Sequence, residues 1–299
     1  MSTPLVSVII ATYNWSSVLP YAIGSVLQQT ITDIEILVVG DCCTDDSEDV
    51  VARVGDPRVR WINLPVNSGH QSEPNNTGLR QARGKYVAYC GHDDLWMPHH
   101  LECAVAALDA GADLTYSVIR TVRPEGTAHD ATAVPFPYTP GLSIPPSSVV
   151  HHHELIKRVG EWQDYRKIQI DPEADLWQRM HQAGCTFAFI PRLTVIKLPA
   201  SMRRNVYKTR PSHEQAAWLK RIQSEPDLEM SELTAMLLIA EQGFLHKSGT
   251  RPYRTVCAEF LKETRERIRI RLAGAFAGIP HSSNMIEYRR RFKGLDRNP

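Results

Sequence analysis

The sequence Leu5-Val6-Ser7-Val8-Ile9-Ile10-Ala11-Thr12-Tyr13 decides the fold, because its β-branched residues run on almost without polar interruption. Such a run is typical of a strand that is buried on both faces of a parallel sheet. Apolar residues then recur at helical spacing from Ser17 to Gln29, and a second apolar run follows over Ile34–Val39. Strand, helix and strand in this order predict two parallel strands that are joined by a right-handed crossover.

The same alternation continues along the chain. Further strands are predicted over 59–64, 86–90, 114–119 and 186–190, and further helices over 47–54, 75–83, 98–110, 153–159 and 171–183. After residue 210 the pattern is helical, with breaks at proline and glycine. We therefore expect an α/β fold with a mostly parallel, Rossmann-like sheet flanked by helices in residues 1–210, and a helical C-terminal extension in residues 211–299.

The composition is that of an ordinary folded protein, with 42% hydrophobic residues, 22% charged residues and a formal net charge of +1. This charge gives no field that would attract nucleic acid. The six cysteines show no CxxC spacing, no apolar run approaches the roughly 20 residues that span a bilayer, and no basic leader begins the sequence. These features predict free thiols and a cytoplasmic location.

Two adjacent acids, Asp93 and Asp94, follow the predicted strand Tyr86–Cys90 after Gly91 and His92. Neighbouring carboxylates repel each other and are costly to desolvate without a positive partner. Mg²⁺ and Mn²⁺ take such oxygen ligands, usually together with substrate phosphates. Because successive side chains of a strand point to opposite faces, we expect one acid to bind the metal and the other to bind another part of the ligand. A solvated turn is the alternative that these residues alone leave open.

Polar residues also follow the other predicted strands, namely Thr12-Tyr13-Asn14, Asp41 and the loop 67–69. In open α/β sheets, ligands bind beyond the carboxyl ends of the strands. The sequence contains neither GxGxxG after the first strand nor GxxxxGK[ST], which argues against a dinucleotide fold and a P-loop. A nucleotide bound here would need a metal to neutralise its diphosphate, with Asp41 accepting a hydrogen bond from the base and Tyr13 stacking on it. Ordinary turn and packing roles are the alternative for these two residues.

Taken together, these segments resemble the family-two inverting glycosyltransferases with the GT-A (nucleotide-diphospho-sugar transferase) fold. The similarity is carried in chain order by Val6–Asn14, Val38–Ser47, the two Asn-x-Gly motifs and Ala-Arg-Gly-Lys-Tyr of 67–86, Asp93-Asp94, and Leu176-Trp177-Gln178-Arg179 after a group of acids. Any one of these motifs is weak, but the ordered set is specific, and it covers about residues 5–200.

The resemblance implies transfer of a sugar with inversion, from a nucleotide-diphosphate donor, most often a UDP-sugar, to a hydroxyl of a saccharide or lipid-linked acceptor. It also implies a divalent cation, Mn²⁺ or Mg²⁺. The donor-binding positions that it implies are Thr12, Tyr13, Asn14, Asp41, Asn76 and Asp93. Asp93 and Asp94 would bind the metal, and Asp94 would also count among the catalytic residues.

The catalytic base position of the family falls on Glu173. A carboxylate there would take the proton of the acceptor hydroxyl as the new bond forms. The alternative role is structural, because Asp171, Pro172 and Glu173 are also what the first turn of any helix favours.

The sequence departs from the family pattern at Gly91 and Gly40, which replace acids, and at Asn75, which stands where an arginine is usual. A basic loop with Arg203 and Arg204, or His213, is a candidate source of the missing positive charge. The departures motivate a second hypothesis, a non-catalytic nucleotide-sugar-binding or scaffold protein on the same fold. A nucleotidyltransferase is the third.

The segment from Thr250 to Lys293 is rich in arginine, with apolar residues at Ile268, Ile270, Leu272, Phe276 and Ile279. Such a segment predicts contact with an anionic membrane surface, packing on the core, or a homodimer contact. The first of these would place the protein at the inner face of the membrane.

Overall fold

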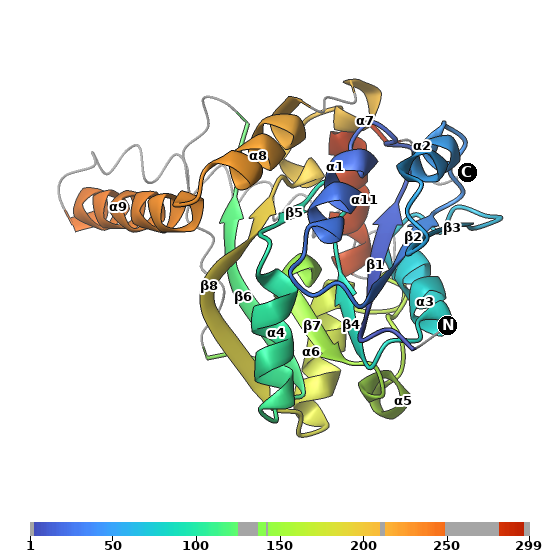
Figure 1. Ribbon diagram of the computed structural model, residues 1–299, viewed down its shortest axis with the longest axis horizontal. Helices are drawn as coiled ribbons and strands as arrows, with labels where there is room; N and C mark the ends of the chain where they lie inside the picture. The colour runs from blue at the N-terminus through green and yellow to red at the C-terminus, as the bar shows by residue number, and fades with distance from the viewer. Residues whose placement is uncertain (1–2, 125–136, 142, 210–212, 249–280, 296–299) are drawn as a thin grey trace.

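The computed structural model describes residues 3–124, 137–141, 143–209, 213–248 and 281–295, and the side chains of all of these except 239–248 and 281–284. Its centre is an eight-stranded sheet in the order β3-β2-β1-β4-β7-β6-β8-β5 (Figure 1). The strands are β1 (Val6–Thr12), β2 (Ile34–Gly40), β3 (Val59–Asn63), β4 (Tyr86–Tyr89), β5 (Leu95–Trp96), β6 (Leu114–Thr121), β7 (Val149–His152) and β8 (Phe187–Lys197).

The sheet is mixed but mostly parallel, as predicted. Strands β3, β2, β1 and β4 run parallel to one another, and β6 pairs in parallel with β8. Two strands run the other way: β7 lies antiparallel between β4 and β6, and β5 lies antiparallel beside β8. Neither was predicted, because β7 is short and half polar and β5 has only two residues.

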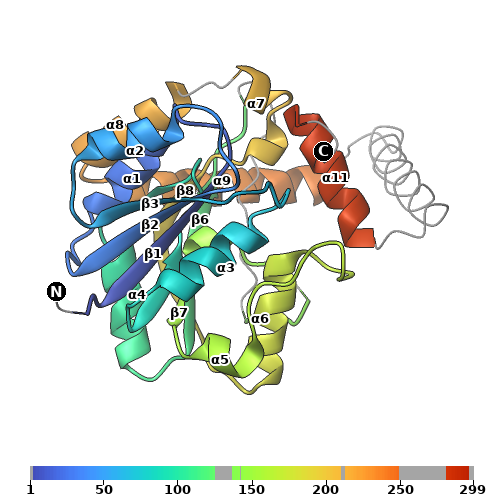
Figure 2. The ribbon, with the colours of Figure 1, turned by 90° about the vertical axis from the view of Figure 1, so that its right-hand side faces the viewer.

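Helices cover both faces of the sheet (Figure 2). On one face α1 (Leu19–Leu27), α2 (Ser47–Val54) and α4 (His100–Asp109) pack on the side chains of alternate strand residues such as Val8 and Ile10. On the other face α3 (Ser72–Gln81), α5 (Leu155–Val159) and α6 (Pro172–Gln182) pack on the intervening ones, such as Ile9. Burial of β1 on both faces, which its apolar run predicted, is confirmed.

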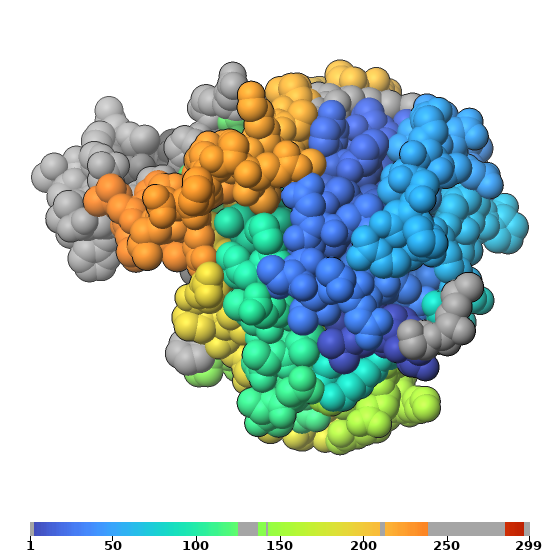
Figure 3. Space-filling model, in the orientation of Figure 1, coloured from blue at the N-terminus to red at the C-terminus, as the bar shows by residue number. Residues whose placement is uncertain are grey.

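The helices beyond residue 210 pack on this core. The remaining elements are η1 (Pro146–Ser148), η2 (Ala200–Met202), α7 (Val206–Thr209), α8 (His213–Ser224), α9 (Leu228–Ser248) and α11 (His281–Lys293). Ile222 and Leu228 bury against β5 and β8, so that α8 covers this end of the molecule while α9 extends away from it (Figure 3). Among the described helices, none has the length and apolar character needed to cross a bilayer.

Helix α11 returns to the carboxyl end of the sheet and lies beside η2 and α7 (Figure 2). The backbone N–H of Asn205, at the start of α7, donates to the carbonyl of Phe292 at 2.8 Å. The five apolar residues on which the membrane prediction depended, Ile268 to Ile279, lie outside the described residues. The boundary at residue 210 stays a prediction.

Candidate active site

A cavity of about 300 Å³ lies at the carboxyl ends of β1, β2, β4 and β8. It brings together residues that are far apart in sequence and that the sequence analysis had placed at separate strand ends. Its charged lining residues are Asp41, Asp93, Asp94, Glu173, Lys197, Arg289, Arg290 and Lys293, and its lining also includes Thr12, Tyr13, His70, Asn75, Gly91, His92 and Tyr207. The predicted convergence of polar strand ends is therefore observed.

The carboxylate of Asp41 is held by the loop that follows β3. Its two oxygens accept the backbone N–H groups of Ser68 at 2.7 Å and Gly69 at 3.0 Å. Gly69 has a φ of 83°, a left-handed conformation that glycine adopts without strain. Burial raises the pKa of Asp41, and these amides partly offset that effect. The loop thus fixes one carboxylate at the end of β2 and leaves its remaining lone pairs toward the cavity.

Thr12 and Tyr13 place a hydroxyl and an aromatic ring in the cavity lining at the end of β1. The Thr12 hydroxyl is 3.0 Å from Nδ1 of His92, and Nε2 of the same ring is 3.2 Å from the Tyr207 hydroxyl. His92 thereby ties β1 to α7, and burial lowers its pKa below the usual value. The Tyr13 ring is half-buried and lies 6.4 Å, between centroids, from that of Tyr207.

Asn14 and Asn76, for which the resemblance implied a donor-binding role, both lie outside the cavity lining. The side-chain oxygen of Asn14 accepts the backbone N–H of Thr44 at 2.7 Å, which holds the loop after β2 against β1. The Asn76 amide exchanges two 2.9 Å hydrogen bonds with the backbone of Trp162. These amides are occupied by backbone partners that a linear sequence does not reveal. The neighbouring residue Asn75 lines the cavity instead.

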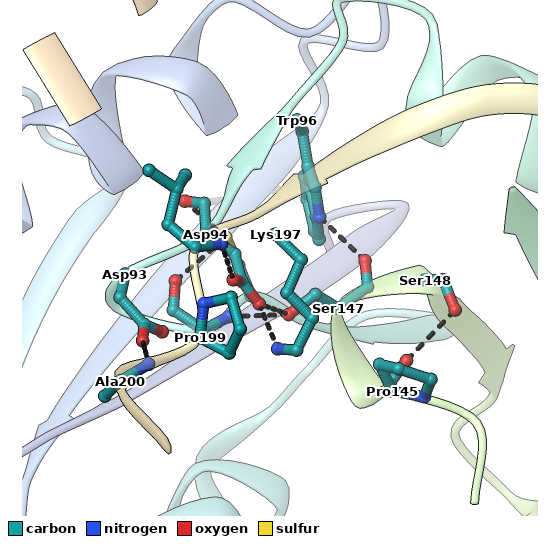
Figure 4. A network of polar contacts seen from close by, with 12 residues as sticks. Asp93, Asp94, Trp96, Pro145, Ser147, Ser148, Lys197, Pro199 and Ala200 are labelled. Carbon is teal, nitrogen blue, oxygen red and sulfur yellow. Dashed lines mark hydrogen bonds and ion pairs between the residues drawn. The ribbon is translucent and has the colours of Figure 1, made fainter. Parts of the chain in front are cut away.

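Asp94 is fully buried and paired with a lysine (Figure 4). Its Oδ2 accepts from Nζ of Lys197 at 2.8 Å and from the Ser147 hydroxyl at 2.5 Å, while its Oδ1 accepts the backbone N–H of Leu198 at 3.1 Å. Burial by itself would lower the pKa of Lys197, but the charges of Asp94 and Asp93 outweigh it and raise that pKa. Asp94 therefore has the positive partner that the sequence required, and this partner is Lys197 of β8.

The two missing acids of the family pattern have steric explanations. A Cβ on Gly91 would lie 2.7 Å from Oδ2 of Asp94, so that Asp94 in its present orientation requires glycine there. A Cβ on Gly40 would lie 2.6 Å from the Trp61 ring and 2.7 Å from Oδ1 of Asn63. Trp61 and Asn63 thus occupy the space into which a side chain at position 40 would point.

Asp93 fits the role of a metal ligand better than Asp94 does. One of its oxygens accepts the backbone N–H of Ala200 at 2.9 Å, at the start of η2 (Figure 4), and the other makes no further hydrogen bond within the described residues. Although burial opposes ionisation, His92, Lys197 and the Ala200 amide together lower the pKa of Asp93. Within the described part of the chain, no group of three or more His, Cys, Asp or Glu side chains is arranged to hold a metal. One carboxylate is nevertheless enough for Mg²⁺ when a substrate supplies phosphate oxygens.

Glu173 lines the same cavity from the first turn of α6. Its Oε1 accepts a 3.2 Å hydrogen bond from the Ser143 hydroxyl. Burial and the nearby charge of Asp171 raise its pKa, against the lowering effects of its own backbone amide, Arg289 and Ser143. Its predicted position at a helix start is observed, and so is its convergence with the acids of β2 and β4. A carboxylate with a raised pKa in a cavity has the properties of a general base.

Four basic lining residues were missed as site residues by the sequence analysis: Lys197, Arg289, Arg290 and Lys293. Of the candidates considered instead, Arg203 is buried and paired with Glu214 at 2.6 Å, and Arg204 and His213 are outside the cavity lining. The only sequence signal for the three α11 residues was the arginine-rich tail itself. Arg289 donates to Asp171 at 3.3 Å, and the Arg290 guanidinium contacts the carbonyl of Gly69.

Residues 7–145, somewhat less than half of the chain, match the family model described as glycosyl transferase family 2. The chain is 35% identical over 124 residues to the succinoglycan biosynthesis protein ExoO of Rhizobium meliloti, covering 41% of this chain and 35% of that protein. It spans about a third of the length of the curated relatives that it matches first.

Two solved structures have the same arrangement of helices and strands. Staphylococcus aureus TarS 1–349 in complex with UDP-GlcNAc has a TM-score of 0.55, with 20% identity over 78% of this chain and 71% of that one. The fold is that of a GT-A glycosyltransferase. The mannosyltransferase PcManGT of Pyrobaculum calidifontis, in complex with GDP-Man and Mn²⁺, has a TM-score of 0.53, with 18% identity over 88% of this chain and 81% of that one. The GT-A resemblance seen in the sequence is thereby confirmed at the level of the fold.

Proposed function

We propose that the chain is an inverting glycosyltransferase that moves a sugar from a nucleotide-diphosphate donor, a UDP-sugar, to an acceptor hydroxyl. The observation that carries this proposal is one cavity, at the carboxyl ends of the parallel strands, that contains Asp41, Asp93 and Glu173 together. The family match of residues 7–145 and the nucleotide-sugar complexes of two proteins with the same fold support it.

In this proposal the donor lies along the ends of β1, β2 and β4. Asp41, which its loop holds in place, accepts the imide N–H of the base, and Tyr13 covers the base. Thr12 and Asp93 lie beside the ribose and the diphosphate. If Mg²⁺ or Mn²⁺ takes part, Asp93 is its carboxylate ligand, and the ion would neutralise charge on the diphosphate that leaves. Asp94 holds Lys197 rather than the metal.

Glu173 acts as the base in a single in-line displacement. Its carboxylate takes the proton of the acceptor hydroxyl while the oxygen bonds to the anomeric carbon, and the bond from that carbon to the diphosphate oxygen breaks. The hydrogen bond from Ser143 orients the carboxylate. The acceptor is a saccharide or a lipid-linked saccharide; the first of these fits the name of the succinoglycan relative. The predicted location is the cytoplasm, and contact with the inner face of the membrane is one of the arrangements that the C-terminal segment leaves open.

A thermal-shift panel of nucleotide-diphosphate sugars, each with and without Mn²⁺, tests the donor site. A ligand that binds only the folded state stabilises it by RT ln(1 + [L]/Kd), about 2.7 kcal/mol at a hundred times Kd. We expect a UDP-sugar to raise the melting temperature more than uridine does. No response to any nucleotide sugar would contradict the proposal.

The second candidate, a nucleotide-sugar-binding protein without transfer activity, is favoured by the occupied state of Asp94 and by glycine at position 91. Product analysis separates the two. Release of nucleoside diphosphate with formation of a glycoside identifies the enzyme, whereas a donor that stabilises the protein and is never consumed, with any acceptor or with water, identifies the binding protein.

A further inference from the structure

Helix α11 places three basic side chains at the cavity, although in sequence it lies far beyond Tyr207, the lining residue that precedes it along the chain. Arg289, Arg290 and Lys293 all line the cavity, and Arg291, between them, is exposed. The helix stands beside the carboxyl ends of the strands (Figure 2). Its basic residues therefore face the space in which the acids of β2 and β4 converge.

Lys293 lines the cavity without forming an ion pair in the part of the chain that the structure describes. Within the described residues its ammonium makes no hydrogen bond or ion pair, and it lies over the Tyr207 ring, 5.7 Å from the centroid. The charged groups around it are one acid, Asp93, and three cations, Arg290, Arg289 and Lys197. Of these cations, Lys197 is already matched by Asp94 and Arg289 by Asp171. A half-buried ammonium in such surroundings is stabilised by an additional anion.

Arg290 connects this unpaired charge to the donor side of the cavity. Its guanidinium contacts the carbonyl of Gly69, and the amide of the same residue donates to Asp41. An anion that contacts both Lys293 and Arg290 thus lies between Asp93 and the loop that holds Asp41. In a nucleotide-linked donor that binds by its base at Asp41, the diphosphate is the part that lies in this region.

We propose that Lys293 and Arg290 of α11 bind the diphosphate of the donor, so that the C-terminal helix is part of the nucleotide-sugar site. This inference rests on the proposed function, because it takes the base to bind at Asp41. It adds a protein source of positive charge to the donor site, and it gives the diphosphate contacts that do not depend on a metal ion. Ammonium and guanidinium groups are the usual phosphate ligands of this kind.

The test compares binding of UDP and uridine by isothermal titration calorimetry, in EDTA, for the wild type and for Lys293→Met. A hydrogen bond to a charged group contributes enough free energy that its loss weakens binding about tenfold or more. We expect Lys293→Met to weaken the binding of UDP by at least this factor and to leave the binding of uridine unchanged. Lys293→Arg, which keeps the charge, should lose little. Arg291→Met, which removes a charge from the same helix outside the cavity, should bind UDP as the wild type does.

Each other outcome contradicts the inference in a recognisable way. Equal binding of UDP by wild type and Lys293→Met overturns the role of α11 and leaves the donor site intact. Equal weakening of the binding of UDP and of uridine shows a general defect of the fold, which circular dichroism of the variant would also report. If Lys293→Met weakens the binding of geranyl diphosphate but not that of UDP, the lysine belongs to the site of a lipid-linked acceptor instead. A wild type that binds neither UDP nor GDP contradicts the proposed function as well.

Discussion

Asp93 and Asp94 are adjacent in sequence and have different surroundings, because the chain turns between β4 and β5. Asp94 is fully buried among Lys197, Ser147 and the amide of Leu198, and Asp93 lines the cavity with one oxygen held by Ala200. The sequence predicted that the two acids would act separately. It could not predict which one is available to a ligand, because Lys197 is more than 100 residues away.

Asp94→Asn is expected to destabilise the protein in the absence of metal. The substitution leaves the half-buried ammonium of Lys197 without its counter-charge, and breaking a pair with a fully buried partner costs about 3 kcal/mol. Urea unfolding in EDTA measures the loss. The double variant Asp94→Asn, Lys197→Met should lose less than Asp94→Asn alone, since no unpaired charge then remains. If Asp94→Asn is as stable as the wild type in EDTA but no longer responds to Mn²⁺, Asp94 is a metal ligand after all.

Glu173→Gln is expected to reduce kcat by about 10² to 10⁴-fold, the usual contribution of general base catalysis. Because glutamine keeps the size of the side chain and can still hydrogen-bond Ser143, donor binding should stay within a factor of two or so of the wild type. Steady-state kinetics and UDP titration measure the two effects. A variant that transfers sugar at the wild-type rate would remove Glu173 from the mechanism.

The pH dependence of activity should carry the signature of the same carboxylate. Because the base acts when ionised, kcat/KM should fall as the pH is lowered through a pKa above the usual value near 4.5. Asp171 raises this pKa and Arg289 lowers it. Asp171→Asn should therefore move the acid limb to lower pH, and Arg289→Met should move it to higher pH. Shifts in the same direction for both variants would exclude Glu173 as the group that titrates.

Among the elements, α8 and α9 are tied to strand β6 of the sheet by one acid. Glu232 of α9 accepts from Arg120 of β6 at 3.0 Å and from Arg221 of α8 at 2.8 Å, and only a tenth of its side chain is exposed. Three elements thus share one carboxylate. This arrangement holds α8 and α9 beside β8, the strand that ends at Lys197 of the cavity.

Glu232→Gln is expected to lower the free energy of unfolding by about 3 kcal/mol, because it leaves the buried guanidinium of Arg120 without its anion. It also removes one of the two carboxylates that Arg221 contacts. Glu225→Gln is the matched control. It removes a carboxylate that Arg221 also contacts, but at the surface, where water screens the pair and its contribution to stability is small. Urea unfolding of both variants makes the comparison, and equal stabilities would show that the shared carboxylate contributes nothing.

For the molecule as a whole, the sequence predicted the α/β architecture and the edge of the sheet at which polar groups gather. Hydrophobic periodicity sufficed for β1, β2 and α1, because each is long and buried on the side that its pattern indicates. It failed for β7, whose pairing between β4 and β6 depends on tertiary contacts. The helical character of the segment after Pro280 was predicted, but the place of α11 at the cavity was not, because it follows from partners that are distant in sequence.

The close approach of Asp94 to Gly91 limits how an acid could be recovered at position 91 by mutation. A Cβ there meets Oδ2 of Asp94 at 2.7 Å, and that oxygen is fixed by Lys197 and Ser147. Gly91→Asp alone is therefore disfavoured, and so is a change of Lys197 alone. Position 91 is therefore epistatic with Lys197 and Asp94. In a combinatorial library, an acid at position 91 should be enriched only together with a substitution at Lys197 or Asp94. Site-saturation of position 91 by itself is expected to return glycine.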